Sequence, residues 1–152
     1  MPVYFGIGAI STKKCCRLAR MAVANGAAAV SVLQPMFLKP TYAELYDHFK
    51  TIAESVPETP VLLYNNPGRV GYTLSAQLVE ELAHTVPNIV GMKDTSGDIT
   101  QTSEFIRPHP GRGVQGLWRQ GYPAVRQPVP RCRGRRMHRS KLYAGAHHRC
   151  VQ

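Results

Sequence analysis

The stretches PVLLYNNPGR (60–69) and NIVGMKDTSGD (88–98) decide the fold of this chain. Each is a short apolar run that stops on a reactive side chain, Tyr64 or Lys93, and then enters a polar loop containing glycine or proline. Because chemistry collects at the carboxyl ends of parallel strands, this pattern predicts an α/β protein with both side chains at one edge of a parallel sheet.

The chain repeats this strand-and-helix pattern four times. Apolar runs begin near residues 3, 28, 61 and 89, and each precedes a helical period of apolar residues. The first helix is expected after Ser11, an N-cap, and should stop at Gly26. The others are expected over about 41–56, 75–84 and from about 98 onward. Four such βα units are half of a (β/α)8 barrel.

A lysine at the end of an apolar strand is a candidate nucleophile. Lysine is rarely buried unless it is paired with an acid or takes part in catalysis, and burial lowers the pKa of an amine. A neutral amine attacks a carbonyl carbon to form a Schiff base, and a neighbouring tyrosine passes the proton that this step needs. Spacing alone also allows a surface lysine beside a core tyrosine, so Lys93 and Tyr64 are candidates at this point.

Four strings in the chain carry a family resemblance. YNNPGRVG (64–71) and GMKDTSGD (91–98) resemble the two signature segments of the dihydrodipicolinate synthase/N-acetylneuraminate lyase family, which are pyruvate-dependent class I aldolases. VYFGIGAIST (3–12) and SVLQPMFLKPTYAELYDHFKTIAE (31–54) resemble its third and fourth units. The resemblance runs from about Pro2 to Arg107. It implies a partial (β/α)8 TIM barrel made of units three to six, with units one and two, including a pair of relay threonines, expected before Pro2.

The resemblance also implies a site. Lys93 matches the Schiff-base lysine, which attacks the keto carbon of pyruvate to give an enamine that adds to an aldehyde. Tyr64 matches the relay tyrosine. Gly68 and Arg69 match a loop whose arginine holds an acidic aldehyde, although an ordinary surface charge is the competing interpretation for Arg69. The expected substrate-binding set is Arg69, Gly68, Asn65 and Thr95, with Asn65 shaping the turn. No cofactor and no metal are implied.

Two departures from the family pattern bear on the substrate. Met36 and Phe37 stand where the synthases usually carry paired tyrosines, and Phe37 has no hydroxyl for a relay. Val70 replaces a threonine that is common after the loop arginine. Arg69 argues against the sialic acid lyase branch, so a sugar-acid or aromatic aldolase stays open beside a synthase.

The charge divides the chain into two compositional halves. Residues 1–107 hold nine Lys and Arg and nine Asp and Glu, so the net charge of +10 lies entirely in residues 108–152. This acid-free tail shows no helical or strand period, and we expect it to be disordered. Reading the codons for GVQGLWRQGYP (113–123) one nucleotide downstream allows GFKVFGGKDTL, which resembles the family's seventh strand. A frameshift between Arg107 and Val114 is therefore our hypothesis, and the chain is expected to be inactive.

A basic binding protein is the alternative function, because ten cations with interleaved aromatic residues could hold phosphates and stack on bases. We nevertheless expect no specific nucleic-acid partner. No apolar run is long enough to span a membrane, and the cysteines form no CxxC pair, so we expect reduced thiols and a cytoplasmic protein. Full-length relatives are expected to be homo-oligomers. His48 and His84 are expected on helix surfaces.

Overall fold

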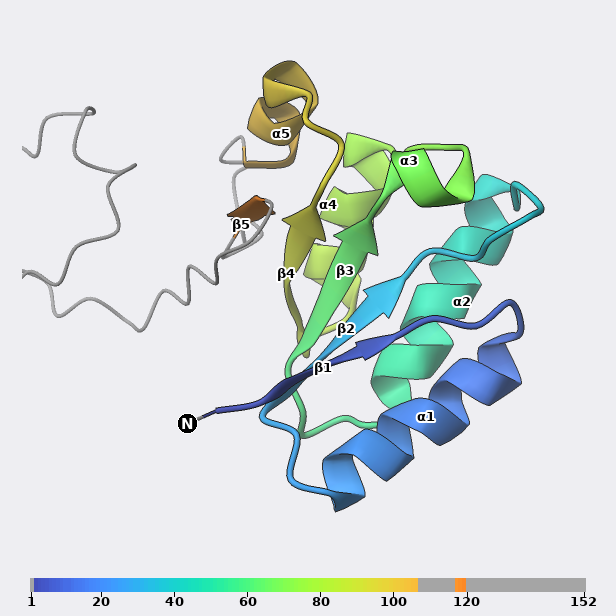
Figure 1. The fold of residues 1–152 in the computed structure, drawn as a ribbon, viewed down its shortest axis with the longest axis vertical. Coiled ribbons are helices and arrows are strands. Elements are labelled where there is room, and N and C mark those ends of the chain that lie inside the picture. Colours follow the sequence, from blue (N-terminus) through green and yellow to red (C-terminus); the bar gives the residue numbers. More distant parts are fainter. Residues whose placement is uncertain (1, 107–116, 120–152) are drawn as a thin grey trace, which may run out of the picture.

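The computed structural model describes residues 2–106 and 117–119, which form one parallel sheet with helices along it (Figure 1). The elements in chain order are β1 (Tyr4–Ile7), α1 (Thr12–Ala24), β2 (Ala29–Leu33), α2 (Tyr42–Glu54), β3 (Val61–Asn65), α3 (Pro67–Val70), α4 (Ala76–Thr85), β4 (Ile89–Asp94), α5 (Ile99–Ile106) and β5 (Leu117–Arg119).

The sheet has the strand order β1-β2-β3-β4-β5, and every pairing is parallel. Strand order that follows chain order, with a helix after each of the first four strands, is the arrangement of a (β/α)8 barrel. The four predicted βα units are therefore confirmed, and the described residues form part of such a barrel. The short helix α3 inside the third unit is not predicted from the sequence.

Local signals place the helix ends close to their predicted positions. The Ser11 side chain accepts a hydrogen bond from the Lys14 backbone N–H, which makes it the N-cap of α1. After α1, Gly26 adopts a φ of 82°, which glycine reaches without strain. Thr41 and Glu44 form a reciprocal capping box at the start of α2. These caps fix where each helix begins relative to the strand end before it.

The hydrophobic core lies between the sheet and its helices. It combines β-branched and other apolar side chains from the strands with one face of each long helix, and its fully buried members include Val30, Val32, Leu63, Met92, Phe49, Ile52, Leu78 and Leu82. Cys15 and Cys16 are buried in α1 as free thiols, as expected. The strands therefore turn one set of alternating side chains into this core and the other set toward the opposite face.

The prediction for His48 is wrong. This residue is only 5% exposed and packs between α1 and α2, where its Nδ1 lies 2.8 Å from Thr12 Oγ1 and its ring meets Phe49 edge-on. Its Nε2 is buried with no hydrogen-bond partner. Burial lowers the pKa of His48 to about 4. His84 is exposed, as predicted.

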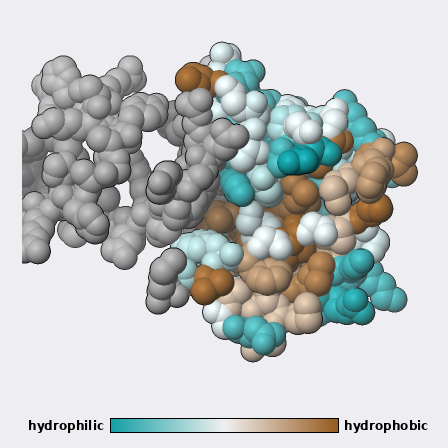
Figure 2. Space-filling view, viewed as in Figure 1, coloured by the Kyte–Doolittle hydropathy of each residue, from teal (hydrophilic) through white to brown (hydrophobic). Residues whose placement is uncertain are grey.

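The sheet face turned away from the helices carries a second set of side chains. Gly6, Ser31, Leu62 and Gly91 share one row across it, and the buried Oγ of Ser31 has no hydrogen-bond partner. Figure 2 shows apolar surface gathered across the middle of the face seen there, over the strands. The exposed aromatic residues Tyr4 and Phe5 lie on β1, the strand at the sheet edge.

The predictions about the basic tail fall almost entirely outside the described residues. The predicted boundary near Arg107, the predicted disorder and the predicted frameshift concern residues 107–152, and of these the structure describes 117–119. One part of the tail is described: β5 pairs in parallel with β4, although the tail has no strand period from which it could be predicted. Among the helices that the structure describes, none is long and apolar enough to cross a membrane.

Candidate active site

The two reactive residues meet at the carboxyl ends of neighbouring strands. Tyr64 on β3 pairs in register with Lys93 on β4, and Leu33 on β2 continues the same row. Lys93 Nζ lies 4.1 Å from the centre of the Tyr64 ring, within cation–π range. Both side chains are partly buried on the face away from the helices. An amine and a phenol are thus held side by side at a strand end.

A chain of hydrogen bonds holds the phenol of Tyr64. Asn66 Nδ2 donates to Tyr64 Oη at 2.9 Å, and the Asn66 backbone N–H donates to Gln34 Oε1 at 3.3 Å. The buried Gln34 side chain also donates through Nε2 to the Tyr72 carbonyl at 2.6 Å. Neither Gln34 nor Asn66 is predicted as a site residue from the sequence. Each is a polar residue directly after a strand, a signal that marks its position but does not reveal its partner.

A second network joins the ends of β3 and β4. Asn65 is 0% exposed; its Nδ2 donates to Asp94 Oδ1 at 2.9 Å, and its Oδ1 accepts from the Leu74 backbone N–H at 3.1 Å. Asp94 also accepts hydrogen bonds from Ser96 and Thr102. Burial raises the pKa of Asp94, but these hydrogen bonds outweigh burial and hold the pKa below its usual value.

The residues expected to bind substrate have two kinds of surroundings: Asn65 and Thr95 are hydrogen-bonded within the protein, and Gly68 and Arg69 are exposed. The Asn65 amide is buried and hydrogen-bonded within the protein, so its side chain supports the turn after β3. Thr95 binds back to the Asn65 carbonyl through its N–H at 3.0 Å and its Oγ1 at 3.2 Å. Gly68 and Arg69 are exposed in α3, directly after β3. No ion pair of Arg69 is found among the described residues.

The loop after β2 exposes Phe37, which stands where the family resemblance implies a tyrosine. Phe37 is 83% exposed and has a φ of 73°, which makes it the one non-glycine residue of positive φ in the described part of the chain. Left-handed backbone is unfavourable for an aromatic residue. The phenyl group of Phe37 therefore lies in solvent and makes no contribution to the Tyr64–Lys93 pair.

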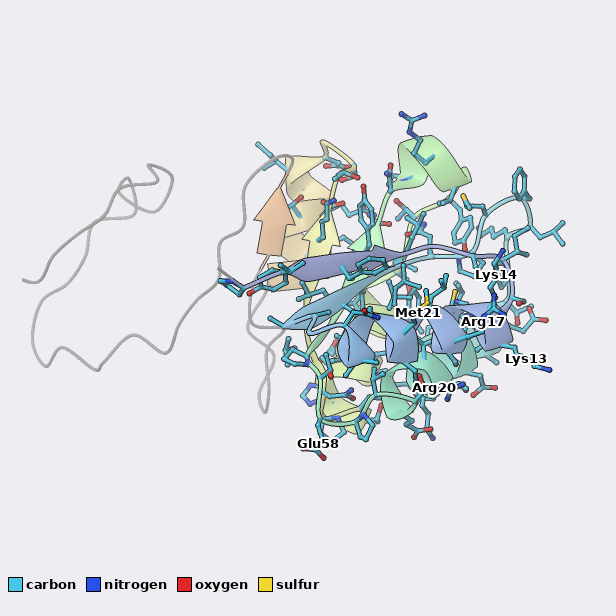
Figure 3. All side chains as sticks on the ribbon, turned by 60° about the horizontal axis from the view of Figure 1, so that its bottom comes forward. Lys13, Lys14, Arg17, Arg20, Met21 and Glu58 are labelled. Atoms are coloured by element: carbon cyan, nitrogen blue, oxygen red, sulfur yellow. The ribbon has the colours of Figure 1, made fainter. Side chains whose placement is uncertain are left out.

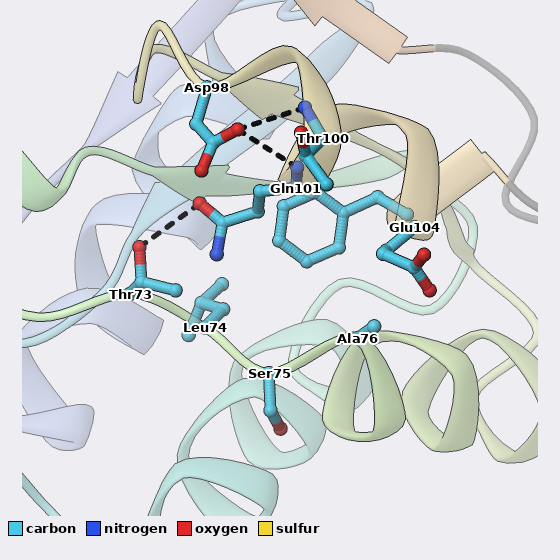
Figure 4. A pocket seen from close by; sticks show the side chains of 9 residues that line it. Thr73, Leu74, Ser75, Ala76, Asp98, Thr100, Gln101 and Glu104 are labelled. Carbon is cyan, nitrogen blue, oxygen red and sulfur yellow. Dashed lines mark hydrogen bonds between the residues drawn. The ribbon is translucent and has the colours of Figure 1, made fainter.

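A separate cleft lies between the start of α4 and α5 (Figure 4). Its volume is 340 Å³, and its walls include Leu74, Ala76 and Phe105 with Gln101 and Asp98 at the polar side. Asp98 accepts from the Thr100 and Gln101 backbone N–H groups and so caps α5. Neither Tyr64 nor Lys93 lines this cleft, so it is distinct from the candidate site.

Replacing Asp94 with asparagine should destabilise the fold by about 2 kcal/mol, because the new amide group cannot accept the two hydroxyl hydrogen bonds now made to Oδ2. Urea unfolding at pH 7 measures this loss. Asp98→Asn is the matched control: it retains an acceptor for the exposed α5 cap, so we expect a loss below about 0.5 kcal/mol. Equal losses in the two variants would contradict the assigned role of Asp94.

The fold and the site together define part of a (β/α)8 barrel with a lysine–tyrosine pair at its strand ends. Comparison with known families identifies the lineage: the model of the Dihydrodipicolinate synthetase family matches residues 1–112. The chain therefore belongs to this family.

Relatives of known name agree with this family assignment. A 4-hydroxy-tetrahydrodipicolinate synthase of Sorangium cellulosum is 40% identical over 107 residues, covering 70% of this chain and 35% of that protein. One from Marinobacter nauticus is 42% identical over 112 residues, covering 74% and 38%. The chain thus spans little more than a third of the length of these relatives.

Solved structures give the same picture. The dihydrodipicolinate synthase of Thermotoga maritima superposes with a TM-score of 0.73 at 32% identity, covering 78% of this chain and 40% of that one. The chloride-inhibited synthase of Acinetobacter baumannii, complexed with pyruvate, has a TM-score of 0.71 at 39% identity with the same coverage. The similarity extends to the barrel architecture, of which this chain supplies a part.

Proposed function

We propose that residues 1–107 carry the Schiff-base centre of a pyruvate-dependent aldolase or lyase resembling a 4-hydroxy-tetrahydrodipicolinate synthase. The observation that carries this proposal is the pairing of Lys93 with Tyr64 at neighbouring strand ends. The Lys93 amine attacks the keto carbon of pyruvate, and water leaves as the imine forms. Loss of a methyl proton then gives an enamine, whose carbon adds to an aldehyde.

Each neighbouring group has a role in this scheme. Tyr64 passes protons to and from the oxygen that leaves pyruvate, and Asn66 holds the phenol in place for that transfer. Arg69 is exposed after β3 and donates two parallel hydrogen bonds to a carboxylate on the aldehyde substrate. Gly68 lets this loop approach the substrate, and Thr95 closes the pocket floor. The scheme uses pyruvate and an aldehyde as substrates, with no cofactor.

We further propose that the 152-residue chain alone is inactive. The sheet face that carries Lys93 is not enclosed within the described residues, and Lys93 is only partly buried. Imine chemistry at neutral pH depends on a closed, preorganised pocket that keeps the amine neutral and excludes water. An open sheet does not supply that environment.

Trapping with borohydride tests this proposal. When the chain is mixed with pyruvate and sodium borohydride, we expect no reduced adduct at Lys93 in the intact-mass spectrum. Residues 2–106 should be trapped once they replace the matching segment of the Thermotoga maritima synthase, because the barrel then closes around the amine. Efficient trapping in the unmodified chain would show that closure is not required.

A frameshift explains the basic tail in this account. All of the net charge of +10 lies beyond Arg107, in a segment with no acidic residue. The DNA after codon 107 should encode the last two barrel units in another frame, and the DNA before Met1 should encode the first two. Flanking DNA without such coding would remove this hypothesis.

A basic protein that binds nucleic acid is the alternative, and the concentrated charge is the observation that favours it. A salt-sensitive, sequence-selective complex would support it over the aldolase lineage. We propose a cytoplasmic location because Cys15 and Cys16 are free thiols, and we propose that full-length relatives assemble as homo-oligomers.

A further inference from the structure

One buried side chain, that of Gln34, bonds to both ends of the loop that follows β3. Gln34 comes directly after β2 and is 1% exposed. Its Oε1 accepts a hydrogen bond from the Asn66 backbone N–H at 3.3 Å, and its Nε2 donates to the Tyr72 carbonyl at 2.6 Å. We call residues 66–72 the α3 loop, because they contain α3 and lie between these two contacts. Both ends of the α3 loop are thus tied to a single amide.

An amide is suited to this pair of contacts because it accepts and donates at once. The Asn66 N–H needs an acceptor and the Tyr72 carbonyl needs a donor, and these two needs also fix which way the Gln34 amide faces. An ionised carboxylate in its place would only accept, and an apolar side chain would leave both backbone groups unpaired. The identity of the side chain at position 34 therefore matters for the loop.

Further contacts hold Gln34 itself in place. Its backbone N–H donates to the Tyr64 carbonyl at 3.4 Å, at the end of β3. The next residue, Pro35, accepts a hydrogen bond through its carbonyl from Tyr72 Oη at 2.8 Å, and Tyr72 is buried. The end of β2, the end of β3 and the residue after α3 are therefore joined around Gln34.

The α3 loop carries two groups that take part in the proposed reaction. Asn66 Nδ2 donates to Tyr64 Oη at 2.9 Å, and Arg69 lies exposed within α3. α3 stands at the rim of the sheet in both views, whereas the labelled side chains of α1, among them Arg17 and Met21, lie away from it (Figure 1, Figure 3). A shift of the α3 loop would therefore displace both the partner of the phenol and the guanidinium group beside the site.

We propose that Gln34 is a positioning residue for Tyr64 and Arg69, acting through the α3 loop. This inference rests on the proposed function, because it assigns Gln34 a part in imine formation. Gln34 acts on the phenol through Asn66, so loss of its amide should change the surroundings of the Tyr64 hydroxyl as well as the rate of the reaction.

The full chain provides the structural test. In the unsubstituted protein, a nuclear Overhauser effect should join the Gln34 side-chain NH2 to Tyr72. The variant Gln34→Met has a side chain of similar length without an amide. It should move the Cζ NMR signal of Tyr64 and should speed hydrogen exchange of the Asn66 amide about tenfold, as expected for one lost hydrogen bond. Absence of the Overhauser effect, or an unmoved Tyr64 signal in the variant, would overturn the proposal.

Asn88 provides the matched control. Its side-chain amide also bonds to the backbone, donating to three carbonyls around the end of α2. It directly precedes β4 and so lies at the amino end of the strand, away from the candidate site. Asn88→Leu should lower the urea midpoint but leave the Tyr64 signal in place. Equal movement of this signal in Asn88→Leu and Gln34→Met would assign the effect to general loosening of the fold and would overturn the proposal.

A second measurement connects Gln34 to the reaction. In the Thermotoga maritima synthase that carries residues 2–106 of this chain, Gln34→Met should slow imine formation between pyruvate and Lys93 about tenfold. Gln34→Glu should slow it less, because its carboxylate still accepts from the Asn66 N–H. A parent rate in Gln34→Met would overturn the role of Gln34 and leave the proposed function standing. If the unsubstituted hybrid forms no adduct, the proposed function fails, and the Tyr64 signal in the full chain still decides whether Gln34 holds the α3 loop.

Discussion

Replacing Tyr64 with phenylalanine should slow imine formation between pyruvate and Lys93 by about 10²- to 10⁴-fold in the barrel-completed protein. This protein is the Thermotoga maritima synthase in which residues 2–106 of this chain replace the matching segment. The substitution removes the hydroxyl that passes a proton to the departing oxygen but keeps the ring beside Lys93 Nζ. The fold should remain, because Tyr64 Oη has one described partner, Asn66 Nδ2, in a part-buried position. Rapid quenching with borohydride after mixing with pyruvate gives the rate.

Tyr46→Phe is the matched control for this prediction. Tyr46 also carries a hydroxyl with one described partner, Thr85 Oγ1 at 2.9 Å, but it lies on α2 away from the strand ends. Its removal should leave the rate of imine formation unchanged. If Tyr64→Phe reacts as fast as the parent protein, Tyr64 is not the proton relay.

The stability of the fold should fall by about 3 kcal/mol as the pH drops from about 6.5 to about 4, owing to His48. Burial lowers the pKa of this imidazole to about 4, from 6.5 in an unfolded chain. Between these pH values the histidine is protonated in the unfolded chain but neutral in the folded chain, so the free energy of unfolding rises with pH. His48 therefore does not destabilise the fold above about pH 6.5, and the loss of stability grows as the pH falls toward 4.

His48→Asn tests this origin, because an amide can still pair with Thr12 Oγ1 but does not titrate in this range. Urea midpoints measured from pH 4 to pH 7 should vary less in this variant than in the parent. His84→Asn removes an exposed histidine and should leave the pH dependence unchanged. An unchanged profile for His48→Asn would assign the acid sensitivity to other groups.

The four strands and four longer helices of the predicted βα units were predictable because their signals are local. Tyr64 and Lys93 each end an apolar run, and equal spacing within consecutive βα units brings them into register on neighbouring strands. Ser11 and Thr41 could be assigned as helix starts because caps depend on a few adjacent residues.

The supporting contacts were not predictable because they join segments far apart in the chain. Gln34 reaches Asn66 and Tyr72 across two loops, and no spacing rule links those positions. His48 appeared to be a surface residue because its helix is amphipathic, but α1 packs over it. Strand β5 lies in a segment without strand period, and its pairing depends on the exposed edge of β4.

The measurement that tests the central claim most directly is peptide mapping of the pyruvate adduct. The barrel-completed protein is reduced with borohydride in the presence of pyruvate, digested and analysed by mass spectrometry. The adduct should lie on Lys93 alone and should be abolished by Lys93→Ala, while Lys50→Ala, a change of a surface lysine on α2, leaves it intact. An adduct on another lysine, or one that survives Lys93→Ala, would contradict the assignment of Lys93 as the nucleophile.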